Sequence, residues 1–399
     1  MDNNVYVKKC RDYDLSRVRD GIASLLAAFG GAAGIAKPGS RVVVKPNLVI
    51  AKSPESAATT HPSVVQAVCE AFIKAGCSVT IADSPGGPFG SVNLKRVYEA
   101  TGMAKVAEIT GAVLCFDGDT IEKQTHGEVC GRFPILKIFD EADAIINVCK
   151  MKTHGLAGLS CAVKNMYGIV PGITKALYHG KYPDRDAFCN MVVDVCACVT
   201  PRLSIADGII GMEGRGPTGG LPKETGVLLA SLNPYALDVE ACRIMGIDPD
   251  TIFTVVHSVR RGLTVQAPIV QGDETVPQKY LQALKTGNAG FRKIIPKRFR
   301  PLWDVIFTPY PSIRRSKCVG CGDCVMSCPK GIITIVKNSG KDSEKGSKKG
   351  SEENLIKNKN HTRSGKSYAK IAHKECIKCY CCHEMCKYRA VDFRYLFKK

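Results

Sequence analysis

The sequence predicts an α/β domain with a mostly parallel sheet and helices on both faces, followed by a small α+β domain at the C-terminus. Two observations predict the first domain: short apolar runs alternate with segments of helical spacing, and glycine or proline separates them. A third predicts the second domain, because one cysteine pattern occurs twice near the end of the chain. We expect the domains to span residues 1–290 and 312–399, joined by a basic linker over residues 291–311.

Strands and helices alternate from the start of the larger domain. A helix is expected at Leu15–Phe29, where apolar residues recur every three or four positions. Another is expected at Pro62–Ala75, because proline favours the first helical position and Gly76 follows the end. The other elements expected in this half are strands at Val5–Val7, Arg41–Lys45, Ser78–Ala82 and Ala112–Phe116, and a helix at Val92–Thr101.

The middle of the chain continues this alternation. The nearly continuous apolar run Ala144–Cys149 predicts a buried strand. Further strands are expected at Leu203–Asp207 and Val227–Ala230, and helices at Ser160–Tyr167, Ala187–Val199 and Pro234–Met245. A glycine-rich loop is expected at Asp207–Gly220, either a surface turn or an anion-binding loop. Its G-x-G-x-x-G match is interrupted by proline and precedes a strand, so we do not expect a dinucleotide site there.

The C-terminal part carries the pattern C-x2-C-x2-C-x3-C twice. The first run is Cys318, Cys321, Cys324 and Cys328, and the second is Cys376, Cys379, Cys382 and Cys386. This spacing is typical of loops that hold [4Fe-4S] clusters, whereas zinc sites usually combine two close cysteines with two distant ligands. Because the fourth cysteine of each run faces the other cluster, we expect crossed ligand sets for two clusters. These sets are Cys318, Cys321, Cys324 with Cys386, and Cys376, Cys379, Cys382 with Cys328.

Residues 312–399 resemble a bacterial two-cluster ferredoxin, with two departures. Lys387 stands where the pattern has proline, and Cys381 beside Cys382 makes the register locally ambiguous. We assign Cys382 as the ligand, because it alone keeps both spacings, and expect Cys381 to be a spare thiol. A low-complexity Lys/Ser/Gly insert at residues 337–367 is expected to be disordered or exposed.

Composition favours a soluble cytoplasmic protein. The chain has 20 cysteines, and those outside the two runs are scattered on apolar segments, as expected for buried thiols in a reducing compartment. The N-terminus has no apolar signal core, and the uncharged run Gly21–Ala36 is short for a membrane span. Positive charge is concentrated from Arg292 to Lys399, with 26 Lys and Arg against 9 Asp and Glu. No aromatic-plus-basic motif accompanies this charge, so nucleic-acid binding is not expected.

Polar side chains stand where several predicted strands end. In an open α/β sheet, ligands bind in the crevice outside the carboxyl ends of the strands. A lysine directly after a buried strand must reach solvent or face an anion. The sequence therefore predicts a site for a carboxylate- or phosphate-bearing ligand or, alternatively, a set of solvated loop charges. The candidate residues are Lys45, Asn47, Lys150, Lys152, His154 and Asp207, with Asp83 and Glu213 nearby, whereas His61, His126, His179 and His257 have no clear partner and are expected to be ordinary.

A family resemblance rests on four of these segments. They are Lys45-Pro46-Asn47-Leu48, Cys149-Lys150-Met151-Lys152-Thr153-His154, Ala162-Val163-Lys164-Asn165 and Asp207-Gly208. Over about residues 1–290 the chain resembles a prokaryotic family known as domain of unknown function 362. The resemblance implies a fold and a C-terminal ferredoxin domain, but no settled activity and no catalytic residues.

The function expected from these observations is single-electron transfer by a protein that binds two [4Fe-4S] clusters. The α/β domain would either dock a redox partner protein or act as an oxidoreductase on a small anionic substrate. One alternative is a redox-sensing or structural iron–sulfur protein that docks on an acidic partner. Another is a maturation factor that binds a metal or cofactor precursor.

Overall fold

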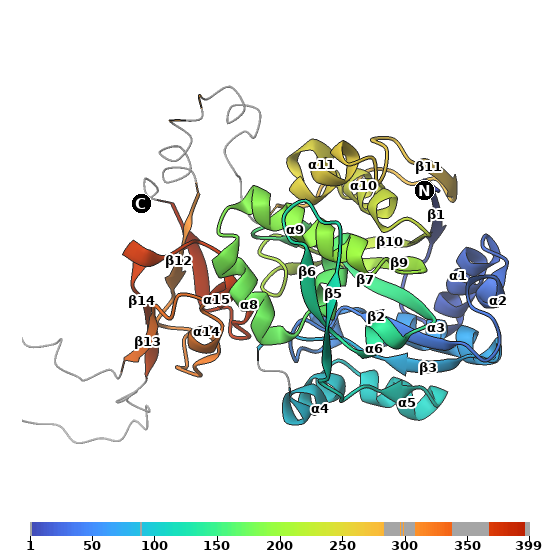
Figure 1. Ribbon diagram of the computed structural model, residues 1–399, viewed down its shortest axis with the longest axis horizontal. Helices are drawn as coiled ribbons and strands as arrows, with labels where there is room; N and C mark the ends of the chain where they lie inside the picture. Colours follow the sequence, from blue (N-terminus) through green and yellow to red (C-terminus); the bar gives the residue numbers. More distant parts are fainter. Residues whose placement is uncertain are drawn as a thin grey trace, which may run out of the picture.

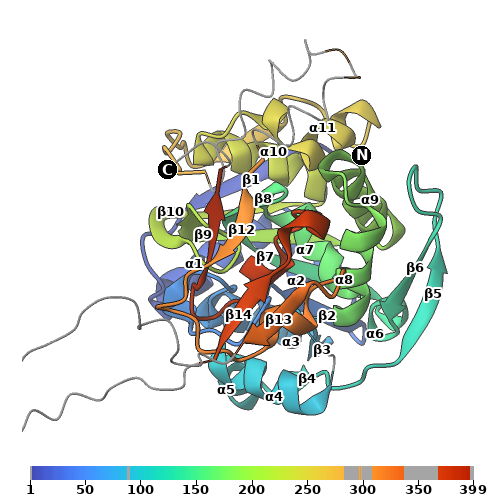
Figure 2. The same cartoon turned by 90° about the vertical axis from the view of Figure 1, so that its left-hand side faces the viewer.

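The computed structural model describes residues 2–87, 90–282, 296, 298, 308–336 and 367–395. Most of the expected linker, and the expected insert apart from Ser367, lie outside these residues. The described chain forms an α/β domain with a smaller C-terminal domain against one end of it (Figures 1 and 2). Within the described ranges, every helix is too short or too polar to span a bilayer.

A nine-stranded mixed sheet forms the centre of the α/β domain. Its order is β11-β1-β10-β9-β7-β2-β3-β4, and β8 pairs with β7. The run from β4 to β9 is parallel, and β10 is antiparallel to both of its neighbours, so the sheet is mostly parallel as predicted. The strands are β1 Asn4–Lys9, β2 Arg41–Pro46, β3 Ser78–Ile81, β4 Val113–Leu114, β7 Ala144–His154, β8 Gly158–Ser160, β9 Leu203–Glu213, β10 Leu221–Ser231 and β11 Ile269–Gly272. A separate hairpin pairs β5 Thr120–Gln124 with β6 Arg132–Leu136.

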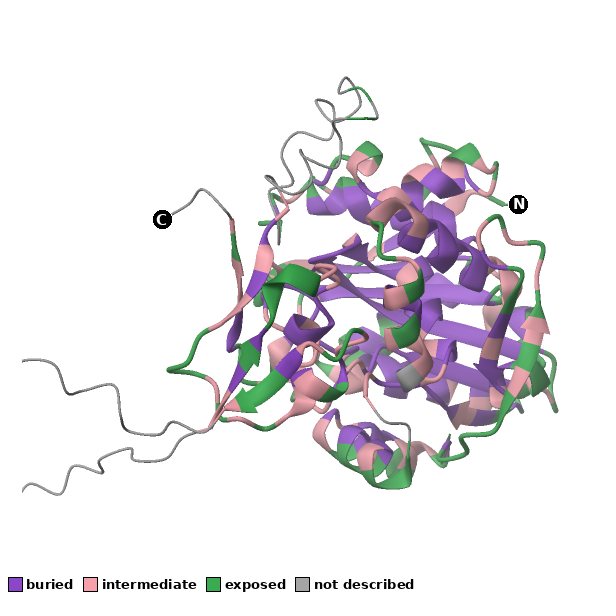
Figure 3. Cartoon of the chain, turned by 60° about the vertical axis from the view of Figure 1, so that its left-hand side comes forward, coloured by how far each residue is buried: buried purple, intermediate pink, exposed green. Residues whose placement is uncertain are grey.

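Helices cover both faces of the sheet, because side chains along each central strand alternate between two apolar cores. Val42 and Val44 pack with α1, α3, α4 and α5, whereas Val43 packs with α6, α7 and α9. The sheet and its flanking helices form the buried centre in Figure 3. The helices are α1 Leu15–Ala27, α2 Gly31–Ile35, α3 Pro62–Lys74, α4 Ser91–Ala100, α5 Met103–Thr110, α6 Ile138–Glu141, α7 Ala162–Met166, α8 Gly172–Lys181, α9 Arg185–Cys198, α10 Pro234–Met245 and α11 Phe253–Arg260.

Three strands extend well beyond their predicted bounds. Strand β7 continues through His154 because β8 pairs with its extension. Strand β9 continues to Glu213 and β10 already begins at Leu221, because these two extensions pair with each other. The predicted loop at Asp207–Gly220 is therefore strand for its first half. Lys150, Lys152 and His154 are consequently buried strand residues and not loop residues.

The C-terminal domain consists of two short antiparallel pairs and two single-turn helices. Its elements are β12 Tyr310–Ile313, α14 Asp323–Met326, β13 Ile333–Val336, β14 Tyr368–Ile371, α15 Cys381–Glu384 and β15 Val391–Arg394, with β12 paired to β15 and β13 to β14. The domain is fixed to the loop after β9: the Thr218 hydroxyl donates to the Glu384 carbonyl oxygen at 2.7 Å. In addition, Met385 packs so closely on Gly86 that a Cβ at Gly86 would lie 2.4 Å from its sulfur. Helix α15 therefore faces the α/β domain.

Candidate functional site between the two domains

The eight predicted cluster cysteines line two small cavities in the C-terminal domain. The first cysteine set, Cys318, Cys321, Cys324 and Cys386, lines one cavity, and the second cysteine set, Cys328, Cys376, Cys379 and Cys382, lines the other. The Ala369 N–H donates to Cys318 Sγ at 3.3 Å and the Ala390 N–H donates to Cys386 Sγ at 3.2 Å. Hydrogen bonds to sulfur are typical of iron–sulfur sites.

This arrangement fits a cubane, whose thiolates stand around a cavity, better than zinc, which draws four ligands to one centre. In the part of the chain that the structure describes, no group of three or more His, Cys, Asp or Glu side chains could hold a single metal ion. Cys381 lines neither cysteine cavity; it faces the α/β domain instead.

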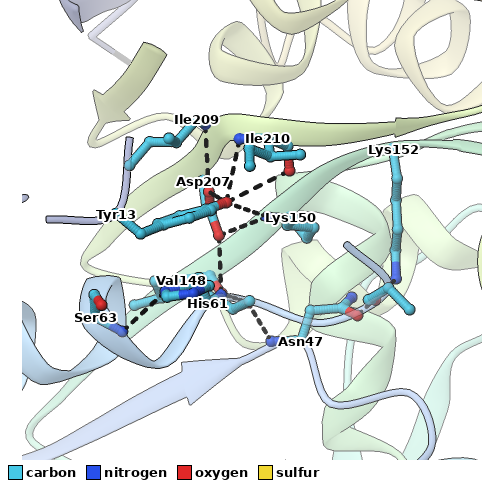
Figure 4. A network of polar contacts seen from close by, with 12 residues as sticks. Tyr13, Asn47, His61, Ser63, Val148, Lys150, Lys152, Asp207, Ile209 and Ile210 are labelled. Atoms are coloured by element: carbon cyan, nitrogen blue, oxygen red, sulfur yellow. Dashed lines mark hydrogen bonds and ion pairs between the residues drawn. The ribbon is translucent and has the colours of Figure 1, made fainter. Parts of the chain in front are cut away.

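Lys150 and Asp207 form a buried ion pair between two neighbouring strands of the sheet (Figure 4). They are neighbours in register on β7 and β9, and Lys150 Nζ lies 2.8 Å from Asp207 Oδ2. Lys150 also donates to the Tyr13 hydroxyl at 2.7 Å, which in turn donates to Asp207 Oδ1 at 2.8 Å. The His61 N–H donates to Asp207 Oδ2 at 2.9 Å, and the His61 ring stacks on Tyr13. With both charges compensated, this pair does not require an external anion.

A second buried network runs from Lys45 to Lys152 through two asparagines. Lys45 Nζ lies 2.7 Å from Asp83 Oδ1, so this lysine is also paired. Asn165 Oδ1 accepts a hydrogen bond from Asn47 Nδ2 at 2.8 Å, and Asn47 Oδ1 accepts one from Lys152 Nζ at 2.8 Å. The other acceptor for Lys152 is the Ala58 carbonyl oxygen at 2.6 Å. Lys152 is therefore the last residue of this network, and both of its hydrogen-bond acceptors are neutral groups.

Lys152 opens onto a cavity of about 390 Å³ between the two domains. We call it the interdomain cavity. The α/β domain contributes Lys152 and His154 from β7, Lys164 from α7, and Lys175 and His179 from α8, together with Asn47, Asp83, Ser84 and Tyr167. The C-terminal domain contributes Cys381, Glu384, Met385, Met326 and Ser327. Helix α15, which also carries Cys382, thus forms part of the cavity wall.

The lysines of the interdomain cavity have no carboxylate partner. Among the residues described, none of Lys152, Lys164 and Lys175 forms an ion pair. Lys175 donates to the Ser84 carbonyl oxygen, and Lys164 lies 5.0 Å from the centre of the Tyr167 ring. Burial lowers the pKa of Lys152 and that of Lys175 to about 7 each. A bound anion would oppose this effect by stabilising the charged forms.

Unpartnered polar atoms gather in the same cavity. Among the described residues, four buried side-chain polar atoms without a hydrogen-bond partner line the interdomain cavity: Ser84 Oγ, His154 Nε2, His179 Nδ1 and Glu384 Oε1. His154 Nε2 and Glu384 Oε1 lie 3.2 Å apart across the domain boundary without the alignment of a hydrogen bond. Because an unpaired buried polar group costs about 1–3 kcal/mol, this concentration indicates a place for a polar ligand.

The structure separates the six residues predicted for anion binding. Asn47, Lys152 and His154 line the interdomain cavity, whereas Lys45, Lys150 and Asp207 are paired in the networks behind it. Sequence reasoning missed Lys164, Lys175, Ser84 and Glu384. It also treated His179 as ordinary, although this side chain lines the cavity, and left His257 without a partner, although its ring lies 3.2 Å from Asp186. Only Lys164 carried a signal, because it lies within Ala162–Asn165, one of the segments on which the family resemblance rests.

Two family models match the chain. Residues 42–243 match the family described as domain of unknown function (DUF362), and residues 317–390 match the family described as 4Fe-4S dicluster domain. The chain is 34% identical over 271 residues to thylakoid-associated protein sll1697 of Synechocystis sp.. This alignment covers 67% of the chain and 82% of that protein. A solved structure, the lactate racemase apoprotein from Thermoanaerobacterium thermosaccharolyticum, aligns with a TM-score of 0.35 and 15% identity. That alignment covers 55% of this chain and 53% of the racemase.

Proposed function

The chain belongs to the domain of unknown function 362 family, and we propose that it is an iron–sulfur oxidoreductase acting on an anionic substrate in the interdomain cavity. One observation carries the proposal: unpaired lysines of the α/β domain and helix α15 of the iron–sulfur domain line the same cavity. Cys381 and Glu384 of α15 contribute to this cavity, while Cys382 of the same helix lines the second cysteine cavity. A substrate bound there would lie directly beside the iron–sulfur domain.

We assign one [4Fe-4S] cluster to each cysteine set. When bound, the clusters would supply or accept electrons one at a time, at potentials set by hydrogen bonds to sulfur and by solvent exposure. The two sets differ in exposure, since Cys321 is exposed and Cys382 is buried. A redox partner protein would therefore dock near Cys321, on the side of the first set, and the substrate would bind near the second.

The side chains of the cavity bind and orient the substrate. Lys152, Lys164 and Lys175 supply positive charge from three separate elements, which fixes the position of an anion better than one flexible lysine could. Tyr167, Met326 and Met385 give the cavity apolar walls, and apolar surroundings strengthen the attraction between the ligand and the lysines.

Localisation is a separate prediction. From the composition of the chain we predict that the protein is cytoplasmic.

Anion binding is expected to weaken as the pH rises. The pKa values of Lys152 and Lys175 lie at about 7 in the free protein, so both side chains are charged below pH 7 and lose their protons above it. Binding above pH 7 must therefore take up protons, which costs affinity. We expect the affinity for malonate, measured by isothermal titration calorimetry on the full cluster-loaded chain, to fall at least about tenfold from pH 7 to pH 8.5.

A matched pair of variants on α8 provides the control for this experiment. Lys175→Met removes a cavity lysine and should reduce malonate affinity at pH 6.5 by roughly tenfold or more. Lys181→Met removes a lysine from the same helix that is exposed and does not line the cavity, so it should bind as the unchanged protein does. Equal binding by both variants, or affinity that is independent of pH, would contradict the proposed site.

A further inference from the structure

His154 presents one unused hydrogen-bond donor to the interdomain cavity. Its Nδ1 atom accepts hydrogen bonds from the backbone N–H groups of Leu156 and Ala157, each at 3.1 Å. A ring nitrogen that accepts in this way carries no proton, so the neutral imidazole holds its proton on Nε2. The turn after β7 therefore fixes the tautomer. The Nε2 atom lies in the cavity wall without an aligned hydrogen-bond partner among the described residues.

The surroundings of His154 keep its ring neutral. The side chain is 2% exposed, and burial together with the positive charges of Lys164 and Lys152 holds its pKa well below the usual range. The charged or titratable groups around it are Lys152 on its own strand, Lys164 on α7, His179 on α8, Arg185 on α9 and Glu384 on α15. A neutral Nε2–H can donate to an unprotonated oxygen but cannot form a salt bridge, so its role is directional.

We infer that His154 is a substrate-binding residue that donates its Nε2–H to a carboxylate oxygen of a small organic dianion. This inference rests on the proposed function, because it concerns the same cavity. Asp83 is paired with Lys45, so the uncompensated charges of the cavity are those of the three lysines and of Glu384. When Lys152 and Lys175 are protonated, the lysines exceed the Glu384 carboxylate by two charges, so a dianion matches the cavity better than a monoanion. The apolar side chains of Val49, Met326 and Met385 suit the carbon skeleton between two carboxylates.

Two substitutions test the roles of the two ring nitrogens of His154 separately. His154→Asn places an amide oxygen near the Nδ1 position, where it can still accept from the turn, but it has no atom at Nε2. His154→Gln places an amide N–H near Nε2 but leaves the N–H groups of Leu156 and Ala157 without their acceptor. A donor role and a purely structural role therefore predict opposite results for the two variants.

The test is calorimetry on the full cluster-loaded chain with malonate, acetate and inorganic phosphate as probes. We expect malonate to bind most tightly to the unchanged protein. His154→Asn should weaken malonate binding about 10- to 100-fold with little change in the thermal midpoint. His154→Gln should bind within about threefold of the unchanged protein while its thermal midpoint falls. His126→Asn, an exposed histidine between β5 and β6, is the control and should change neither quantity.

The possible outcomes distinguish this inference from the proposed function. Unchanged malonate binding by His154→Asn would overturn the donor role and leave the cavity as an anion site. Tighter binding of phosphate or acetate than of malonate would overturn the assignment to an organic dianion. Failure of every probe to bind the unchanged protein would overturn both proposals. The weakening caused by His154→Asn should also be the same at pH 6 and pH 8; a larger effect at pH 6 would mean that the ring binds as a cation.

Discussion

Cys382→Ser should reduce the iron content of anaerobically purified protein from about eight atoms per chain to about four. Cys382 lines the second cysteine cavity together with Cys328, Cys376 and Cys379, so its loss should remove one cubane and leave the first set intact. Iron and acid-labile sulfide analysis measures this change, and electron paramagnetic resonance of the reduced protein identifies the remaining cluster.

Cys381→Ser is the matched control, because Cys381 is the adjacent residue on the same helix and is also buried. Cys381 lines the interdomain cavity and neither cysteine cavity, so this variant should keep about eight irons. A loss of four irons in Cys381→Ser, with full retention in Cys382→Ser, would mean that Cys381 is the cluster ligand and Cys382 is the spare thiol. Loss of all iron in Cys382→Ser would mean that the two cysteine sets cannot load independently.

Lys150→Met should destabilise the α/β domain by about 3–5 kcal/mol. Lys150 is the ion-pair partner of Asp207, which is fully buried, so the substitution would leave a buried carboxylate without its counter-charge. The result should appear as a lower urea midpoint, followed by far-UV circular dichroism. Affinity for malonate should change little as long as the protein is folded, because Lys150 does not line the interdomain cavity.

Lys152→Met, two residues along the same strand, should lower stability less than Lys150→Met does and should weaken malonate binding more. Lys152 has no carboxylate partner and is bound to Asn47 and the Ala58 carbonyl oxygen, so its loss leaves two neutral acceptors unpaired. We expect a smaller loss of stability, about 1–2 kcal/mol, and a clear loss of malonate affinity. Similar destabilisation by both substitutions would show that the two lysines do not divide into a structural one and a binding one.

The contrast between Lys150 and Lys152 also shows what the sequence alone could predict. The apolar runs of the strands and the cysteine spacing depend on local pattern, so the fold class and the iron–sulfur character of the C-terminal domain followed from them. The extension of β7 to His154 depends on β8, which the local pattern did not reveal. The pairing of Lys150 with Asp207 depends on the register between β7 and β9, which only the folded sheet establishes.

The interdomain cavity could be predicted only in part for the same reason. Lys152 and His154 were found because they follow a buried apolar run, where charge is unusual. Lys175 and His179 lie on α8 and Glu384 lies on α15, both far from Lys152 and His154 in the chain, and each alone is an ordinary polar residue of a helix. Only the docking of helix α15 against the α/β domain brings them into one site.

In the proposed function, the interdomain cavity and the iron–sulfur domain form one functional unit. A reductive titration, monitored by electron paramagnetic resonance with and without saturating malonate, tests whether they are coupled. A negative charge bound beside one cluster should lower the reduction potential of that cluster by roughly 30–60 mV, and Lys175→Met should abolish the shift. Potentials that stay the same in both conditions, while calorimetry shows that malonate is bound, would mean that the cavity and the clusters are independent of each other.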